Sequence, residues 1–386
     1  MRSYNILYLH NKSGISGGER SLLNLWENLD RKEFALYLIV PSKGDFSLEA
    51  EKKGVKVSFL EIPRLNMMNS GVIIKRMLSM VQYVRAHNID LIHSYTPRNN
   101  ILGAGVAKFC SIPVIWHERN MLYGGEKDVT AKFFFLPDKI ICNSKAVAGR
   151  FGPADTLPSR VAVILNGVDL ARFNPSADKE KIIREFSAGG KKIVGVVSNM
   201  NSRKRVDYFL EAASIINKRR DDVLFLVVGG EFTEAGSGRR SELTGFSEIL
   251  GLKKNIVFTG FRDDIPELLS AMDISVNVTE KEACSRAVIE SMASGKPVVA
   301  MNDGGNPELV ENGISGVLVD PCDIRDFVAQ IEGLLSDDNK RKEMGERARE
   351  RAEKLFDVKR NARQTADLYR ELVDNGRAGW IKSKGQ

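Results

Sequence analysis

The chain has 386 residues, of which 43% are hydrophobic and 28% charged, which is an ordinary composition for a globular protein. This length exceeds one ordinary hydrophobic core and suits two domains. The net charge of +7 lies in residues 1–170, which carry 22 Lys/Arg and 15 Asp/Glu, because the remainder carries 35 of each. Such an excess fits a phosphorylated substrate, an anionic membrane or nucleic acid. It also fits a merely solvated basic surface.

Several classes of protein are disfavoured at this level. No apolar run reaches 18 residues, so no membrane-spanning helix is expected. The N-terminal stretch has too short an apolar core for a signal peptide and no small-residue cleavage site. The cysteines form no CxxC pair, which argues against disulfides and structural zinc and favours a reducing, cytoplasmic location. They are Cys110, Cys142, Cys284 and Cys322.

Short β-branched runs alternate with helical patterns along the whole chain. Most of these runs are continuously apolar, as in parallel strands that helices bury on both faces. Such alternation predicts doubly wound α/β architecture. The predicted strands are 5–10, 34–40, 55–60, 91–95, 113–118, 139–144 and 161–167, then 192–198, 223–230, 255–261, 274–279, 297–301 and 315–319.

A boundary is predicted near residue 173. The stretch 166–181, "NGVDLARFNPSADKEK", is rich in polar residues and contains glycine and proline, and the strand–helix alternation starts afresh after it. We therefore expect two Rossmann-like domains, 1–173 and 174–357, that face each other across a cleft. The helical pattern in the remaining residues, 358–386, follows a complete second domain and is expected to pack back on the first.

In open parallel sheets, ligands bind at the carboxyl ends of the strands, so the loops after strands are the places to search. The first such loop, "HNKSGISGGER", contains Gly14, Gly17 and Gly18 just before a helical pattern. Glycine permits close backbone approach, and free N–H groups at a helix start attract an anion. The spacing is not GxGxxG, and a plain tight turn is the alternative.

A basic cluster follows the first strand of the second domain. In "SNMNSRKRVDYFL", Arg203, Lys204 and Arg205 precede a helix N-terminus, where the helix dipole favours anions rather than cations. A bound phosphate would explain that placement, and a solvated basic turn is the alternative.

Histidines mark the ends of predicted strands in the first domain. His117, in "VIWHERN", stands beside Glu118 and Arg119, and its position at a carboxyl end makes it a candidate for function. His10 and His93 occupy similar positions and are rivals. A lone histidine at a strand end is also often a satisfied structural residue.

Two glutamates frame the most informative segment, "EACSRAVIE". Ser285 is a natural N-cap and Gly295 a natural stop, so a helix is predicted from about Arg286 to Ser294. Glu282 then lies in the preceding loop and Glu290 projects from the helix. Between them, the N–H groups of Cys284, Ser285 and Arg286 offer a phosphate site. Acids that bind hydroxyls at two ends and amides that bind phosphate between them describe a nucleotide-sugar site.

These motifs resemble a known family. The segment 282–319, "EACSRAVIESMASGKPVVAMNDGGNPELVENGISGVLV", is similar to the E-x7-E region of the retaining glycosyltransferases of family 4, which have the GT-B fold. The likeness extends over most of the chain. Its other parts are "GGERSLLNL", "NSKAV", "NGVDLARFNP", "KRVDYFLEA" and "FTGFRDDIPELL".

The resemblance implies roles for the candidate residues. Glu290 would bind the nucleotide ribose, Glu282 the sugar hydroxyls, and Lys204 the diphosphate. Gly17 and Gly18 would approach donor phosphate and acceptor, and His117 would contact the sugar near its reacting carbon. The segment of Phe261 and Arg262 would border the base. The family often has Gly-Arg where this chain has Ser198-Asn199, and Arg203 is the candidate for the missing charge.

The reaction that the resemblance implies moves a sugar from a UDP-sugar or GDP-sugar to a hydroxyl of a sugar, glycan or glycolipid, as in cell-surface polysaccharide or glycolipid synthesis, with retention of configuration. No D-x-D occurs in the chain, so we expect no metal, no cofactor and cations of the protein at the diphosphate. The alternatives are a glycosidase that uses the two glutamates, an NDP-sugar epimerase, and an inactive nucleotide-sugar-binding subunit. Nucleic acid is not an expected partner, because no basic motif interleaved with aromatic residues occurs.

The first domain is also predicted to meet an anionic membrane surface. Basic residues gather in 51–88, and Met67 and Met68 precede a helical run in which Ile73, Met77, Met80, Val81 and Val84 form a core face. The alternative is that the acceptor is soluble and that the basic surface of this domain has no membrane to bind. The basic residues are Lys52, Lys53, Lys56, Arg64, Lys75, Arg76 and Arg85.

Overall fold

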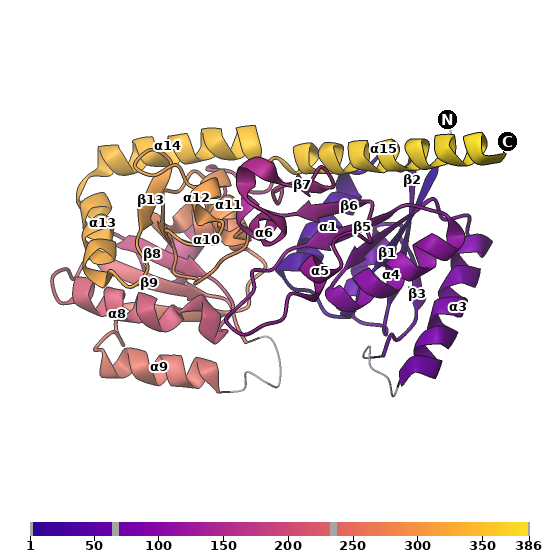
Figure 1. Ribbon diagram of the computed structural model, residues 1–386. Coiled ribbons are helices and arrows are strands. Elements are labelled where there is room, and N and C mark those ends of the chain that lie inside the picture. The colour runs from indigo at the N-terminus through magenta and orange to yellow at the C-terminus, as the bar shows by residue number, and fades with distance from the viewer. Residues whose placement is uncertain (1–2, 64–68, 232–237, 385–386) are drawn as a thin grey trace. The chain divides into compact units, whose positions relative to one another are not determined.

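The computed structural model describes residues 3–63, 69–231 and 238–384 (Figure 1). The chain divides into two compact units, which are described separately. Unit 1 comprises Met1–Gly167 and Val358–Gln386, and unit 2 comprises Val168–Asp357. The sequence-based boundary near residue 173 lies a few residues beyond the first of these divisions, within the polar segment that follows the last strand of unit 1.

Unit 1 contains a seven-stranded parallel sheet with the order β3-β2-β1-β4-β5-β6-β7. All seven predicted strands of the first half are present; six lie within about two residues of the predicted ends, and the last, predicted over 161–167, ends at Val163. The order reverses between β1 and β4, so their carboxyl ends form a topological switch point. The strands are β1 (Tyr4–Leu9), β2 (Phe34–Val40), β3 (Lys56–Phe59), β4 (Leu91–Tyr95), β5 (Val114–Glu118), β6 (Lys139–Cys142) and β7 (Val161–Val163).

Seven helices belong to unit 1 in the described part of the chain. The last of them, α15, packs against α1, and its Ala362, Ala366, Tyr369 and Val373 lie in the same buried cluster as Trp26 and Phe34. The predicted return of the C-terminal helix to the first domain is therefore confirmed. The helices are α1 (Gly17–Asn28), α2 (Asp45–Lys52), α3 (Ser70–Ala86), α4 (Pro97–Cys110), α5 (Val129–Lys132), α6 (Lys145–Ala148) and α15 (Val358–Lys384).

Unit 2 contains a six-stranded parallel sheet with the order β10-β9-β8-β11-β12-β13. All six strands predicted for the second half are present, and the switch point lies between β8 and β11. The strands are β8 (Lys192–Val197), β9 (Val223–Val228), β10 (Ile256–Gly260), β11 (Ile274–Asn277), β12 (Val298–Met301) and β13 (Gly316–Val319). The helices are α7 (Glu180–Glu185), α8 (Val206–Asn217), α9 (Arg239–Ile249), α10 (Ile265–Ala271), α11 (Arg286–Ala293), α12 (Asn306–Leu309), α13 (Ile324–Ser336) and α14 (Asp338–Leu355).

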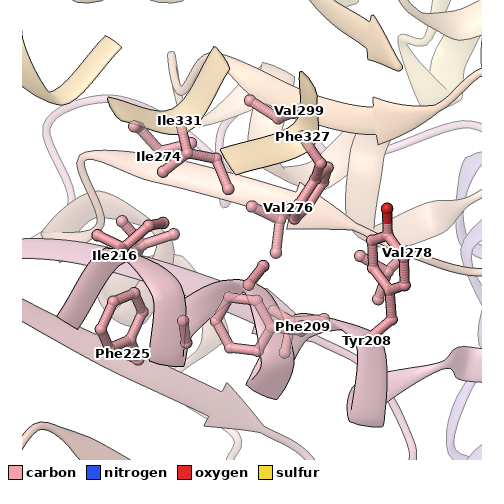
Figure 2. Packing of buried hydrophobic residues seen from close by; sticks show 14 of the residues in the cluster. Tyr208, Phe209, Ile216, Phe225, Ile274, Val276, Val278, Val299, Phe327 and Ile331 are labelled. Carbon is pink, nitrogen blue, oxygen red and sulfur yellow. The ribbon is translucent and has the colours of Figure 1, made fainter. Parts of the chain in front are cut away.

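The core of unit 2 lies between its sheet and the helices α8 and α13. Figure 2 shows Phe209 and Ile216 of α8 beside Phe225 of β9, with Phe327 of α13 near Val276 of β11 and Ile331 near Ile274. These side chains are almost entirely buried, and each is worth roughly 1.5–3 kcal/mol on transfer from water. The strands are apolar on both faces because helices cover both, which is why the sequence shows continuous apolar runs.

Helix α3 agrees with its predicted core face. Met80, Val81 and Val84 are buried, and Ile73 and Met77 are half-buried on the same side. Arg64, Met67 and Met68, which the sequence places in a membrane-facing loop, lie outside the described residues. Within the described ranges, no helix is both long enough and apolar enough to cross a bilayer.

Candidate functional site

The candidate site of unit 2 lies at its switch point. Strands β8 and β11 pair directly, and the loops that leave their carboxyl ends contain the basic cluster 203–205 and the first glutamate of the E-x7-E motif. Backbone contacts join the two loops, because the N–H of Glu280 donates to the carbonyl of Arg203 over 3.3 Å. The fold thus brings together two motifs that are about 80 residues apart in sequence.

Glu282 is fixed by its side chain and its backbone. Its Oε2 lies 2.6 Å from Nζ of Lys204, and its carbonyl accepts the N–H of Gly305 over 2.7 Å. Gly304 has a positive φ of 58°, and a Cβ there would lie 2.2 Å from the carbonyl oxygen of Glu282. Only glycine fits such a position, so the segment "DGGN" holds Glu282 in place.

Helix α11 begins and ends as predicted. Ser285 caps it, since its Oγ accepts the N–H of Val288 over 3.3 Å, and Gly295 adopts a φ of 69° just beyond its end. Asn277, the last residue of β11, donates to the same Oγ over 3.1 Å. The cap is therefore tied to the sheet, and the N-terminus of α11 faces the carboxyl edge, where an anion would be stabilised.

Glu290 forms an ion pair with Arg286 one helical turn earlier. Arg286 Nη2 lies 2.5 Å from Glu290 Oε1, and both side chains are mostly buried. Nη1 of Arg286 is buried without a hydrogen-bond partner in the described structure. A buried guanidinium N–H without an acceptor is costly, and a ligand oxygen would satisfy it.

The three cations of the basic cluster have different surroundings. Lys204 pairs with Glu282, whereas Arg205 pairs with Glu280 and Asp207. Arg203 is exposed, and its N–H donates to Asn201. The predicted conflict with the helix dipole is thus relieved for two of the three by carboxylates, so the cluster requires no phosphate to be stable.

The segment predicted to border the base has two distinct members. The ring of Phe261 is 60% exposed and lies against Gly230, where a Cβ would come within 2.6 Å of the ring. Arg262 donates to Glu185 over 2.5 and 2.8 Å and to Asp264 over 2.8 and 2.7 Å. Its guanidinium therefore braces α7 against the start of α10, and a role in binding a base stays a prediction.

Ser198 and Asn199, which stand where the family often has Gly-Arg, follow β8 directly. The carbonyl of Ser198 would lie 1.9 Å from a Cβ at Gly229, whose φ is 130°. The loop thus packs its backbone on the glycine pair 229–230 of the neighbouring strand. Asn199 cannot supply a positive charge there, so Lys204 and Arg203 remain the candidate cations of this loop.

In unit 1, the first loop contains a buried histidine–glutamate pair. Nε2 of His10 lies 3.2 Å from Glu19 of α1, and Glu19 also accepts the N–H of Ser16 over 2.8 Å. Burial lowers the pKa of His10 to about 4, so it is neutral at physiological pH. Helix α1 starts at Gly17, and a Cβ at Gly18 would lie 3.9 Å from the guanidinium of Arg119.

His117 lies close to its rivals in the fold. Its Nδ1 is 3.1 Å from Tyr95 Oη and 3.2 Å from Nε2 of His93, and its Nε2 is 3.5 Å from Nη1 of Arg119. Burial, then Arg119 and His93, lower the pKa of His117 well below its ordinary value. The expectation that His93 ends a strand is wrong, because it is the third of the five residues of β4 and is fully buried.

One feature of this edge was missed by sequence reasoning. Thr96, at the carboxyl end of β4, has a φ of 85°, which is rare for a β-branched residue, and its Oγ1 is buried without a partner among the described residues. Strain of this kind collects at functional positions. The sequence signal was weak: a threonine before a proline at the first helical position.

No group of three or more metal-ligating side chains occurs among the described residues. The candidate site of unit 2 instead contains two carboxylates, two neighbouring cations and a capped helix N-terminus. Such a set can bind hydroxyls and a diphosphate.

Comparison with known proteins agrees with this chemistry. The model described as "Glycosyltransferase Family 4" matches residues 15–172, and "Glycosyl transferases group 1" matches residues 178–351. An Escherichia coli protein named UDP-Gal:alpha-D-GlcNAc-diphosphoundecaprenol alpha-1,3-galactosyltransferase is 26% identical over 94% of this chain and 95% of its own length.

Solved structures agree over the whole chain. Anabaena HepE in complex with UDP and glucose has a TM-score of 0.80 and 25% identity, and covers 94% of this chain and 98% of its own. A glycosyltransferase from Rickettsia africae has a TM-score of 0.86 at 21% identity, covering 97% and 100%, which shows the fold alone.

The two parallel-sheet units and the matched models define a glycosyltransferase of the GT-B fold class. The chain belongs to glycosyltransferase family 4, and the family resemblance drawn from the E-x7-E segment is confirmed.

Proposed function

We propose that this enzyme transfers a hexose from a UDP-sugar to a hydroxyl of a lipid-linked or polysaccharide acceptor and retains the anomeric configuration. The observation that carries the proposal is the paired arrangement at the unit 2 switch point. There, Glu282 with Lys204 and Glu290 with Arg286 flank a capped helix N-terminus. UDP is preferred to GDP because HepE was solved with UDP and with UDP-glucose, and the E. coli relative is named for UDP-Gal.

Each group of this site has a part in donor binding. Glu290 accepts the two ribose hydroxyls, while the exposed ring of Phe261 offers a stacking surface for uracil. The N–H groups of Cys284, Ser285 and Arg286 bind the diphosphate together with Arg203 and Lys204. The diphosphate draws Lys204 away from Glu282, which leaves that carboxylate free to accept the hydroxyls of the sugar.

Charge develops on the departing diphosphate during the reaction. The bond between the anomeric carbon and the diphosphate oxygen breaks, and the acceptor oxygen bonds to the same carbon. The acceptor proton passes to the leaving phosphate oxygen. Lys204 and the helix N-terminus stabilise that oxygen more strongly as its charge grows, which lowers the barrier. No protein nucleophile is needed in this step.

The other candidates fit less well. A glycosidase would use Glu282 and Glu290 as its carboxylate pair, yet both carboxylates are engaged by cations. The likeness, over nearly its whole length, to a named galactosyltransferase disfavours an NDP-sugar epimerase. An inactive binding subunit would not require the Lys204–Glu282 arrangement.

The proposed acceptor is lipid-linked, by analogy with the diphosphoundecaprenol in the name of the E. coli relative, and we place the enzyme at a membrane surface. Helix α3 supports this location. Val72, Ile74 and Leu78 of this helix are exposed, the last two at 59% each. The helix also carries Lys75, Arg76 and Arg85 and no acidic residue. Apolar side chains beside basic ones are typical of helices that lie on anionic bilayers.

The donor is tested by thermal unfolding with UDP, GDP, ADP and dTDP at equal concentrations. UDP is expected to raise the melting temperature most, because binding to the folded state alone stabilises it. Transfer from UDP-galactose and UDP-glucose to N-acetylglucosaminyl-diphospho-lipid is then followed by product mass and by the anomeric proton coupling. A larger shift with GDP, or an inverted product, would contradict the proposal.

The membrane location is tested by co-sedimentation with vesicles that contain or lack anionic phospholipid, at low and high salt. Ile74→Glu with Leu78→Glu should abolish binding to anionic vesicles. The control is Ile249→Glu on α9 of unit 2, where an isoleucine is 84% exposed. Equal sedimentation with and without anionic lipid would mean that the acceptor is met in solution.

A further inference from the structure

A turn of exposed aromatic residues follows helix α5 in unit 1. We call residues 133–136, "FFFL", the aromatic turn; it is closed by the N–H of Leu136, which donates to the carbonyl of Phe133 over 2.9 Å. Phe135 is 59% exposed, and the other three side chains are exposed by 36–41%. Turns on a protein surface are usually built from Gly, Asn, Asp, Ser and Pro. Contiguous apolar side chains at such a place are typical of a surface that meets a partner.

The backbone of the aromatic turn has its acceptors satisfied within the protein. Nη1 of Arg160 donates to the carbonyls of Phe135 and Pro137 over 2.9 and 3.0 Å. The carbonyl of Phe134 lies 3.5 Å from the same nitrogen, and that of Phe133 is occupied by the turn itself. In a lipid phase, where no water is available, backbone polar groups need partners inside the protein. The turn can therefore leave water with these carbonyls still hydrogen-bonded.

Helix α5, which leads into the turn, is fixed to the sheet. Asp128 caps it by accepting the N–H of Ala131 over 2.8 Å, and Arg150 donates to both oxygens of Asp128 over 2.8 and 2.7 Å. Arg150 also pairs with Glu118, the last residue of β5, over 2.7 Å. The apolar side chains are thus presented on a braced element, and little order has to be gained when they meet a partner.

The aromatic turn continues a larger apolar surface of unit 1. The connections through α3, α4 and α5 all run in the same direction across the sheet, so right-handed crossovers place these helices on one face. Helix α4 contacts both α3 and α5, and Figure 1 shows the three next to one another.

Most of the exposed apolar side chains lie on this face. Of the fourteen large apolar residues exposed in the described part of the chain, three belong to α3, one to α4 and five to α5 and the aromatic turn. The residue of α4 is Phe109, which is 67% exposed. Phe109 precedes β5 as the turn precedes the neighbouring strand β6, so both lie at the amino edge of the sheet.

The charge of this face indicates which partner covers it. The three helices, all within the described ranges, carry six Lys/Arg and no Asp or Glu. Asp138, just after the turn, is engaged, because it accepts the N–H of Val114 over 2.8 Å. A symmetric pair of copies would bring this patch and its like charges against themselves, which is unfavourable. An anionic bilayer attracts the cations, and its acyl boundary accepts the apolar side chains.

We propose that the aromatic turn, with Phe109, enters the boundary between headgroups and acyl chains of an anionic bilayer, and that α3, α4 and α5 lie on the membrane surface. This inference deepens the proposed function and rests on it in one respect, since a lipid-linked acceptor is the reason for the enzyme to meet a bilayer. The rings supply the apolar part of the binding, whereas the Lys and Arg side chains supply the part that salt screens.

The first measurement places a fluorescent reporter in the turn. Phe135→Trp keeps an aromatic ring there, and the parent protein gives the signal of the native tryptophans for subtraction. With vesicles of phosphatidylethanolamine and phosphatidylglycerol, its emission should move to shorter wavelength and be quenched by lipids brominated in their acyl chains. Ile249→Trp, at the exposed end of α9 in unit 2, is the control and should show neither change. Emission of Phe135→Trp that vesicles leave unaltered would overturn the proposal.

The second measurement is co-sedimentation with the same vesicles. Phe133→Ser with Phe135→Ser should lower binding at least about tenfold, because two rings no longer leave water on binding. The control is Leu48→Ser on α2, whose connection runs the opposite way across the sheet and so lies on the other face. Unfolding temperatures check that each variant is folded. Binding by the double variant that equals wild type contradicts the proposal, as does loss of self-association in place of vesicle binding in sedimentation velocity.

These measurements separate this inference from the proposed function. If vesicle binding survives the turn variants but not Ile74→Glu with Leu78→Glu, the enzyme meets the membrane through α3 alone and the inference is wrong. If the wild-type protein binds no vesicles, the inference and the membrane location are both wrong. Neither measurement uses a nucleotide, so the assignment of the donor depends only on the thermal shift with UDP.

Discussion

The two units share one architecture but differ in the kind of polar side chains that they place at the switch point. Unit 1 carries 29 Lys/Arg and 17 Asp/Glu, a net +12, and unit 2 carries 28 and 33, a net −5. Yet the candidate site of unit 1 is a buried, neutral network of histidine and tyrosine, whereas that of unit 2 is built from ion pairs. Net charge thus gives no guide to the chemistry of either site.

Under the proposed function, the difference reflects what each edge would bind. A diphosphate and ribose hydroxyls need full charges, and the ion pairs of unit 2 keep such charges stable until a ligand replaces one partner. A buried neutral imidazole offers a single acceptor atom, which is enough for one hydroxyl. All four histidines and all three tryptophans of the chain belong to unit 1, so the two units can be followed separately.

The largest effect is expected at the ion pairs of unit 2. Lys204→Ala should lower kcat/KM at least about a hundredfold, because a charge-assisted hydrogen bond to the leaving diphosphate is lost. The control is Lys253→Ala, an exposed lysine of the same unit. Steady-state kinetics on both variants check this. Near-normal turnover in Lys204→Ala would remove the cation from the mechanism and break the contrast between the units.

Nucleotide binding should depend on Glu290. Glu290→Ala is expected to weaken UDP binding at least about tenfold, because a carboxylate bond to a ribose hydroxyl is worth roughly 1.5–3 kcal/mol. Glu290→Gln keeps one acceptor oxygen and should lose less. Isothermal calorimetry measures both, with Glu248→Ala on α9 as control. Unchanged affinity in Glu290→Ala would rule out this ribose site.

Acid should destabilise unit 1 before unit 2. Burial lowers the pKa of His10 to about 4 and of His93 to about 3, so below the ordinary value of 6.5 the unfolded chain binds these protons first. Stability of unit 1 is therefore complete above about pH 6.5 and falls as pH decreases toward these values. Tryptophan fluorescence reports it, and hydrogen exchange reports unit 2, which has no histidine. A parallel loss in both units would contradict the assignment.

No effect is expected from removal of divalent metal. The basic cluster 203–205 and the lack of a D-x-D motif predict that turnover in excess chelator equals turnover in magnesium. Activity that is abolished by chelator and restored by magnesium would show that the protein cations of unit 2 do not suffice.

The fold could be predicted from the sequence because most strands are continuous apolar runs between turn signals. Helix α11 was predicted to within a residue, since its cap and its glycine stop are local features. The ion pair between Glu282 and Lys204 could not be predicted, because it depends on β8 and β11 being neighbours in the sheet. The family resemblance named both residues but not their contact.

The buried histidine–tyrosine network of unit 1 could not be predicted for the same reason. Tyr369 and His93 are 276 positions apart, and nothing in the periodicity of α15 distinguishes a tyrosine that packs from one that donates. The positive φ of Thr96 and the bracing of Arg262 by Glu185 and Asp264 are likewise decided by tertiary contacts. Sequence patterns predicted candidate site residues but not how the structure holds them.

The return of α15 to unit 1 has a consequence for biosynthesis. The core around Trp26 and Phe34 includes Ala366, Tyr369 and Val373, which leave the ribosome only after the whole of unit 2. Unit 2 is contiguous and can fold as soon as it emerges. The half of the enzyme that is translated first is therefore completed last, because its core lacks these side chains until synthesis ends.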